Sequence, residues 1–191
     1  MLRAFFVKLR QTRTSCTGVS RPKDRGQLFL MSQPTIRAFI QARMSSTRFP
    51  GKVLAPLNGE PVISWVIHRL ANAVPLDNMV LATSIDKSDD PLSLYGEKLG
   101  VPVFRGPLED CFGRFQLCLE AHPCDWFTRV CADSPFLDPK ITQRMFTYVN
   151  QTNIDLVTNT FPRSFPKGRS VEMVKSDTFA SIDSHRLSTE Q

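Results

Sequence analysis

The chain has 191 residues, of which 41% are hydrophobic and 22% charged, and these proportions are typical of a single soluble globular domain. No run approaches the roughly 20 consecutive apolar residues of a membrane-spanning helix, so the sequence excludes a membrane span. The net charge of +6 resides in residues 1–30, which hold seven basic residues and one acid, whereas the remainder holds 17 of each. A neutral domain of this kind argues against binding to nucleic acid through a broad basic surface.

Residues 1–30 are predicted to be a basic extension that precedes a domain at residues 31–191. The extension is rich in arginine and poor in acids, as organelle transit peptides are, but the alternative is that translation starts at Met31. Because Lys8 interrupts the apolar run at residues 4–9, we expect no secretory signal and a cytoplasmic, reducing location.

Five cysteines follow neither CxxC nor Cys/His metal spacing, and they are predicted to be free thiols: Cys16, Cys111, Cys118, Cys124 and Cys131. Cys111 and Cys118 lie at helical spacing with Phe112, Phe115 and Leu119, which predicts that they are small hydrophobic residues on a core stripe. A catalytic cysteine is not expected, because no motif supplies it with a histidine partner.

From Thr35 onward, short β-rich runs alternate with longer segments of 3.6-residue period, a pattern that predicts an α/β fold with a Rossmann-like, mainly parallel sheet. In chain order, strands are expected at residues 36–42, 79–83, 101–104, 126–131 and 155–159. Helices are expected from Pro61 to just before Pro75 and at residues 89–99, 108–122 and 139–150. In such sheets ligands bind at the loops that follow the strands.

The loop after the first expected strand is rich in cations and hydroxyls. It reads QARMSSTRFPGK at residues 41–52 and contains Arg43, Arg48 and Lys52, together with Ser45, Ser46 and Thr47. A triphosphate needs several such donors, because charge-assisted hydrogen bonds hold its anionic oxygens. The alternative is an ordinary solvated loop. The Walker pattern GxxxxGK[ST] is absent, so this is not a P-loop.

Asp133 follows the strand expected at residues 126–131, in the sequence Ala132-Asp133-Ser134-Pro135. Mg²⁺ favours one or two protein carboxylates together with phosphate oxygens and water. A carboxylate at a strand's carboxyl end, facing a cationic loop, is therefore a candidate magnesium ligand. An aspartate that only caps the turn is the alternative.

These motifs occur in the order found in cytidylyltransferases: IQARMSSTRFPGK at 40–52, ATS at 82–84, VFRG at 103–106, ADSP at 132–135 and SVE at 170–172. Over about residues 36–191 the chain resembles the cytidylyltransferase family named for spore-coat polysaccharide biosynthesis, which is related to the acylneuraminate and keto-deoxy-octulosonate enzymes. The resemblance implies a nucleotide-diphospho-sugar transferase fold. It also implies transfer of CMP from CTP to a sugar, sugar acid or sugar phosphate, with release of pyrophosphate and with magnesium as cofactor.

The resemblance also implies roles for individual residues. It places the nucleotide on Arg43, Ser46, Arg48, Lys52, Ala82, Thr83 and Arg105, and the metal on Asp133; Arg43, Lys52 and Asp133 are the expected catalytic residues. Asp110 is expected either to line the same cleft or to act as an N-terminal helix charge.

Two features depart from the family. Many relatives carry an aspartate two residues before the glutamate of the last motif, where this chain has Ser170, so Glu172 is the expected second metal ligand. Relatives also continue further, so the domain is expected to be incomplete at its C-terminus, and a homodimer is possible for it. Two alternatives remain: a glycosyltransferase of related fold, whose DxD motif is missing here, and an inactive nucleotide-binding fragment.

Overall fold

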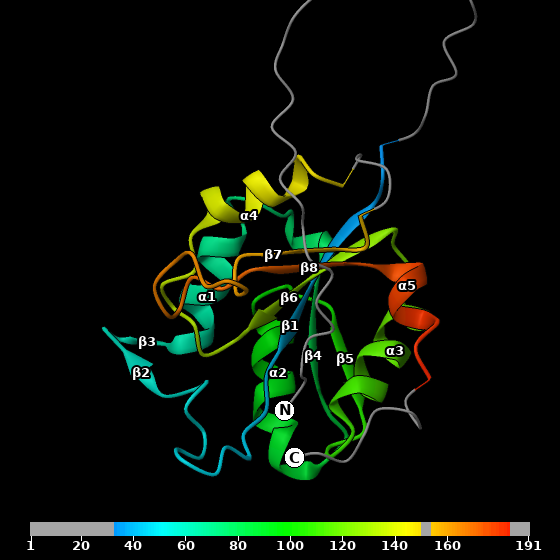
Figure 1. The fold of residues 1–191 in the computed structure, drawn as a ribbon. Coiled ribbons are helices and arrows are strands. Elements are labelled where there is room, and N and C mark those ends of the chain that lie inside the picture. The colour runs from blue at the N-terminus through cyan, green and yellow to red at the C-terminus, as the bar shows by residue number, and fades with distance from the viewer. Residues whose placement is uncertain (1–32, 150–153, 184–191) are drawn as a thin grey trace, which may run out of the picture.

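A computed structural model describes residues 33–149 and 154–183 of the chain, so the predicted basic extension at residues 1–30 and Cys16 lie outside the described residues. The fold is a six-stranded sheet with helices on both faces (Figure 1). Helices α1, α2 and α4 cover one face, and α3 and α5 cover the other. Within the described ranges no helix is long and apolar enough to cross a bilayer.

The sheet has the strand order β5-β4-β1-β6-β8-β7. Its strands are β1 (Ile36–Gln41), β4 (Met79–Ser84), β5 (Val103–Gly106), β6 (Trp126–Cys131), β7 (Leu156–Thr158) and β8 (Glu172–Lys175). The pairs β1–β4, β1–β6 and β4–β5 are parallel, while β8 runs antiparallel to both β6 and β7. The predicted α/β class and mainly parallel sheet are confirmed.

The helices are α1 (Val62–Leu70), α2 (Asp90–Lys98), α3 (Cys111–Ala121), α4 (Pro139–Phe146) and α5 (Ser176–Ala180), with short 3₁₀ turns η1 (Leu76–Asn78) and η2 (Lys87–Asp89). Their starts follow ordinary capping rules. Asp138 accepts a hydrogen bond from the Lys140 backbone at 3.0 Å, with Pro139 in the first turn of α4. The four expected helices are present, although α1, α3 and α4 are shorter than predicted.

The structure corrects the sequence predictions at three places. Pro61 lies in a small hairpin, β2 (Pro56–Leu57) with β3 (Glu60–Pro61), and caps α1 from outside its first turn. The hairpin turns at Asn58 and Gly59, whose positive φ angles of 51° and 88° suit these residue types. Strand β8 and helix α5 were not predicted. Both are short, with four and five residues, and β8 has a single fully buried position, Met173.

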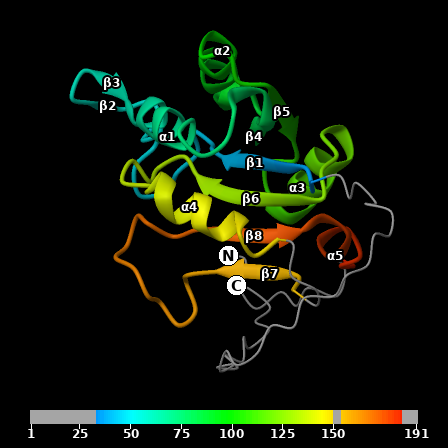
Figure 2. The same ribbon diagram turned by 90° about the horizontal axis from the view of Figure 1, so that it is seen from above.

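The buried core has three clusters, which lie on the two faces of the sheet. Figure 2 shows the strands that separate them, in the order β5-β4-β1-β6-β8-β7. The predicted apolar stripe of α1 is buried against β1 and β4. On the other face, Phe39 stacks on Phe127 with ring centroids 5.0 Å apart, among rings from α3 and α5. Cys118 is buried there, and burial raises the pKa of its thiol to about 12. The four described cysteines are free, as predicted.

Candidate active site

The central strands β1 and β6 bring the two predicted loops together. They are parallel neighbours with Gln41 opposite Cys131, and Ala132 extends the ladder by donating to the Gln41 carbonyl at 3.0 Å. The carboxyl ends of parallel strands lie at the same edge of the sheet. Arg43 and Asp133 each lie two residues beyond the paired positions, so both are at that edge. Sequence order had separated them by 90 residues.

The first loop, residues 42–52, is closed around Met44. The Met44 carbonyl accepts hydrogen bonds from the backbone N–H groups of Ser46 and Gly51, both at 2.9 Å. Gly51 has a φ of +70°, and a Cβ there would lie 3.4 Å from the Met44 methyl carbon. A side chain at this position would therefore be strained, which explains the glycine in the motif.

A cavity of about 280 Å³ opens between the first loop and Asp133. Its lining residues come from both loops: Gln41, Ala42, Arg43, Ser45, Ser46, Thr47, Arg48, Lys52, Val53, Cys131 and Asp133. Three of them are cations and one is an acid, so the cavity has an excess of positive charge that suits a polyanion. The structure thus brings together five predicted site residues, namely Arg43, Ser46, Arg48, Lys52 and Asp133.

Lys52 and Asp133 form a direct ion pair across this cavity, between Nζ and Oδ2. Their side chains are 29% and 38% exposed, and an exposed pair of this kind contributes about 0–1 kcal/mol to stability. Both groups can therefore exchange partners at little cost. The described residues contain no group of three or more His, Cys, Asp or Glu side chains that could hold a metal ion. Asp133 is the one acid among the lining residues of this cavity.

Arg43 is held by the segment that leads into α3. Its Nη1 donates to the Leu108 carbonyl at 3.2 Å, and the same carbonyl accepts from Nη1 of Arg114 at 3.2 Å. Arg114 is fully buried, also donates to the Pro107 carbonyl at 2.6 Å, and finds no acceptor for Nε and Nη2 among the described residues. No sequence pattern indicated this role for Arg114, because an arginine within an amphipathic helix ordinarily faces solvent.

Four other predicted site residues lie outside the cavity lining. Ala82 and Thr83 are fully buried within β4. Arg105 donates to the Ser84 carbonyl at 2.8 Å, the Asp86 carbonyl at 2.9 Å and Asp90 at 2.7 Å, so it braces the connection between β4 and α2. Glu172, the fourth, lies on β8.

Glu172 is paired with Arg129 of the neighbouring strand β6. Its Oε2 accepts from both Nε and Nη2 of Arg129, at 2.8 and 2.6 Å, and these are charge-assisted hydrogen bonds. Nη1 of Arg129 donates to the side chain of Gln41 at 3.2 Å. Asp110, for which two roles were open, caps α3 by accepting from the Gly113 backbone at 2.8 Å.

Comparison with known proteins decides the family. Residues 38–182 match the sequence profile of the family described as Cytidylyltransferase. The chain belongs to this family. It is 40% identical over 110 residues to the spore coat polysaccharide biosynthesis protein SpsF of Bacillus subtilis (strain 168), a match covering 56% of this chain and 46% of that protein.

Two proteins named as cytidylyltransferases extend the comparison. The chain is 30% identical over 113 residues to a 3-deoxy-manno-octulosonate cytidylyltransferase of Cytophaga hutchinsonii, over 58% of this chain and 44% of the relative. The solved structure of a cytidylyltransferase from Leptospira borgpetersenii serovar Hardjo-bovis is similar with a TM-score of 0.73 at 31% identity, over 76% of this chain and 62% of that chain. The matches to the two curated relatives span slightly less than half of their length.

In this member of the cytidylyltransferase family, the Arg129–Glu172 pair predicts a measurable stability effect. Replacing Glu172 by glutamine should lower the free energy of unfolding by about 2 kcal/mol, because it leaves a mostly buried guanidinium without its counter-ion. The unfolding temperature should fall by roughly 4–8 °C, as measured by thermal denaturation, whereas Glu120→Gln at an exposed site on α3 should leave it unchanged. An unchanged unfolding temperature combined with lost magnesium-dependent CTP binding would instead make Glu172 a metal ligand.

Cys131 lines the cavity but is not suited to act as a nucleophile. Burial raises the pKa of its thiol, which keeps the group neutral near neutral pH, and a thiol reacts as the thiolate. The prediction against a catalytic cysteine is consistent with this environment.

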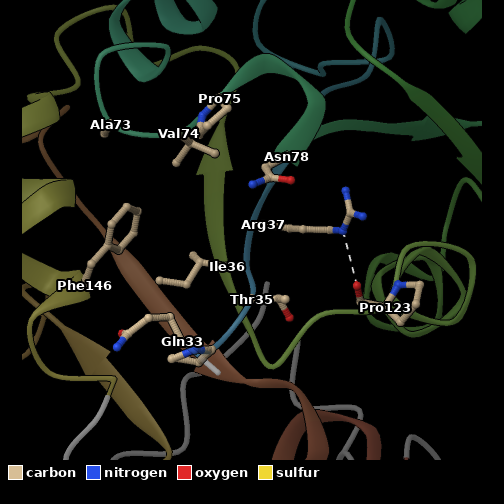
Figure 3. A pocket seen from close by; sticks show the side chains of 11 residues that line it. Gln33, Thr35, Ile36, Arg37, Ala73, Val74, Pro75, Asn78, Pro123 and Phe146 are labelled. Atoms are coloured by element: carbon tan, nitrogen blue, oxygen red, sulfur yellow. Dashed lines mark hydrogen bonds between the residues drawn. The ribbon is translucent and has the colours of Figure 1, made fainter. Parts of the chain in front are cut away.

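Figure 3 shows a second hollow, of about 340 Å³, at the opposite edge of the sheet near the start of β1. Arg37 is the one charged residue among its described lining residues. Its Nε and Nη1 already donate to the carbonyls of Pro123 and Asp77, at 3.3 and 3.1 Å. None of the predicted site residues lines this hollow, which makes the cavity at the carboxyl edge the candidate active site.

Proposed function

We propose that the chain transfers CMP from CTP to a sugar or sugar acid and releases pyrophosphate. One observation carries the proposal: in a member of the cytidylyltransferase family, the cavity at the carboxyl ends of β1 and β6 collects Arg43, Arg48 and Lys52 opposite Asp133. A cationic cavity with one acid suits a triphosphate that is bound together with a divalent metal.

The three cations bind the triphosphate in this proposal. Arg43 uses one N–H donor on the Leu108 carbonyl, and since a guanidinium has five such donors, others serve phosphate oxygens. Arg48 is exposed at the cavity rim, and Ser46 adds a hydroxyl. The phosphates replace Asp133 as the partner of Lys52. Fixed positive charge at the β- and γ-phosphates stabilises the pyrophosphate as its negative charge grows.

Asp133 is the proposed magnesium ligand. It is the single carboxylate of the cavity lining, and Mg²⁺ binding to nucleotides requires only one or two. When bound, the ion neutralises charge on the phosphate oxygens. Glu172 is a second ligand in this scheme only where its pair with Arg129 opens, which the glutamine variant described above tests.

The acceptor is proposed to be a sugar or sugar acid with a free hydroxyl. The name of the Cytophaga relative, a 3-deoxy-manno-octulosonate cytidylyltransferase, supports a sugar acid. The hydroxyl oxygen forms a bond to the α-phosphorus of CTP while the bond from that phosphorus to pyrophosphate breaks, and the hydroxyl proton is released to solvent. Three residues expected at the nucleotide do not line the cavity, namely Ala82, Thr83 and Arg105. In this proposal they hold the surrounding structure in place and do not contact the nucleotide.

Selective stabilisation by CTP tests this function. At a CTP concentration of 100 times the dissociation constant, with magnesium, the folded state gains about 2.7 kcal/mol, which corresponds to a rise of roughly 5–10 °C in unfolding temperature. UTP, GTP and ATP at the same concentration should give much smaller shifts in differential scanning fluorimetry. No shift with any nucleotide would contradict the proposal.

A pyrophosphate-release assay then identifies the reaction. With CTP, magnesium and a panel of sugar acids that includes 3-deoxy-manno-octulosonate, a cytidylyltransferase releases pyrophosphate in an acceptor-dependent manner. A glycosyltransferase of related fold would instead consume a nucleotide sugar and release no pyrophosphate. CTP binding without any product would identify a nucleotide-binding protein that lacks activity.

A further inference from the structure

We propose that Asp89, which does not line the cavity, is a positioning residue that fixes the shape of the first loop for nucleotide binding. The inference rests on the proposed function, because it assigns the first loop to the triphosphate. Its basis is a carboxylate that is fully buried and yet reaches from the connection after β4 to the loop after β1.

The Asp89 carboxylate ties two neighbouring strand ends together. Its Oδ1 accepts from the backbone N–H of Met44 at 2.6 Å. Its Oδ2 accepts from the backbone N–H of Ser84 at 3.0 Å and from the Ser84 hydroxyl. A buried carboxylate with hydrogen bonds from both sides has one preferred placement, since leaving either donor unsatisfied is unfavourable. The carboxylate therefore fixes the first loop relative to the end of β4.

Asp89 contacts the first loop at Met44, the residue around which that loop closes. The Met44 carbonyl holds the backbone N–H groups of Ser46 and Gly51, and Met44 directly follows Arg43. A rotation of the backbone at Met44 would therefore move a cation of the cavity and release the hydrogen bonds that curl the loop over it. Asp89 acts on the cavity through this one backbone contact.

Asp89 is itself held rigidly. It ends the short turn η2, where its backbone N–H donates to the Asp86 carbonyl at 3.0 Å and the Asp86 side chain accepts from the Ser88 backbone at 2.8 Å. Arg105, which lies on β5, donates to the Asp86 carbonyl and to the Asp90 side chain. The role of Arg105 in the site thus runs through the same connection, which presents Asp89 to the first loop.

The chain offers a matched control. Asp125 accepts from the backbone N–H and the hydroxyl of Thr35 at 2.7 and 2.8 Å, at the opposite end of β1. It is the same type of contact, between a carboxylate and the backbone of a neighbouring segment, but it lies away from the cavity. Asp125→Asn therefore reports the cost of losing such a contact at an exposed position away from the cavity.

The test compares Asp89→Asn with Asp125→Asn. Asparagine keeps the size of the side chain but has one acceptor and one donor group, so it cannot satisfy both Met44 and Ser84. In isothermal titration with CTP and magnesium, Asp89→Asn should weaken binding about tenfold or more, while Asp125→Asn should bind like the wild type. A CTP dissociation constant within about twofold of wild type in folded Asp89→Asn would overturn the positioning role.

Hydrogen exchange supplies a readout that does not require CTP. Peptides covering residues 42–55 should exchange faster in Asp89→Asn than in wild type, and unchanged exchange there would overturn the inference even if the wild type bound no nucleotide. Wild-type binding of CTP decides the proposed function separately. If Asp89→Asn fails to fold, Asp86→Ala, at an exposed position, loosens η2 instead. It should raise both the exchange rate and the CTP dissociation constant, and no change in either would overturn the inference.

Discussion

Replacing Lys52 by methionine should lower turnover about 100- to 1,000-fold without unfolding the protein, as expected for the loss of one fixed charge that stabilises a transition state. Methionine keeps much of the length of the side chain and removes the ammonium group that faces the cavity. Stability should change little, because Lys52 is 29% exposed and its pair with Asp133 is a surface-type ion pair. Pyrophosphate release at saturating CTP and magnesium, with the sugar acid that the wild type accepts, measures the effect.

Lys140→Met is the matched control for Lys52→Met. Lys140 lies exposed on α4 and does not line the cavity, so its replacement should leave turnover within about twofold of wild type. Thermal denaturation of both variants separates folding from chemistry. Wild-type turnover in folded Lys52→Met would remove the first loop from the mechanism.

Replacing Asp133 by asparagine should abolish the contribution of magnesium to CTP binding. In the wild type, magnesium should tighten CTP binding, because metal and nucleotide share the carboxylate and phosphate oxygens. In Asp133→Asn the dissociation constants with magnesium and with a chelator should become equal. Turnover should fall by about two orders of magnitude or more, since the reaction loses the metal's charge neutralisation.

The change in CTP affinity that Asp133→Asn causes in the absence of metal gives this prediction a second check. Without its acid, the cavity retains Arg43, Arg48 and Lys52, so metal-free CTP should bind Asp133→Asn at least as tightly as the wild type. Asp77→Asn, at an exposed position in η1, is the control and should preserve the full magnesium effect. An equally large magnesium effect in Asp133→Asn would exclude Asp133 as the ligand.

The sequence predicted the centre of the fold because its signals are local. Strands β1, β4 and β6 are short runs of buried residues between amphipathic helices, and that alternation is typical of a parallel sheet. The rule that ligands bind at the carboxyl ends of such strands then singled out the loops with Arg43 and Asp133. Polar, short elements such as β8 carry no comparable signal, so their place between β6 and β7 was not predictable.

The amino-acid sequence by itself determined the α/β class, the two loops of the candidate site and their chemistry, because periodicity, charge and motif order are properties of the chain. The tertiary structure alone decided which residues meet. Register placed Glu172 opposite Arg129 on the adjacent strand, a buried connection brought Asp89 to Met44, and β5 turned Arg105 toward Asp86 and Asp90. Each pairing joins residues 15 to 45 positions apart in the chain. Such contacts depend on how the sheet is assembled, and no local pattern of side chains encodes them.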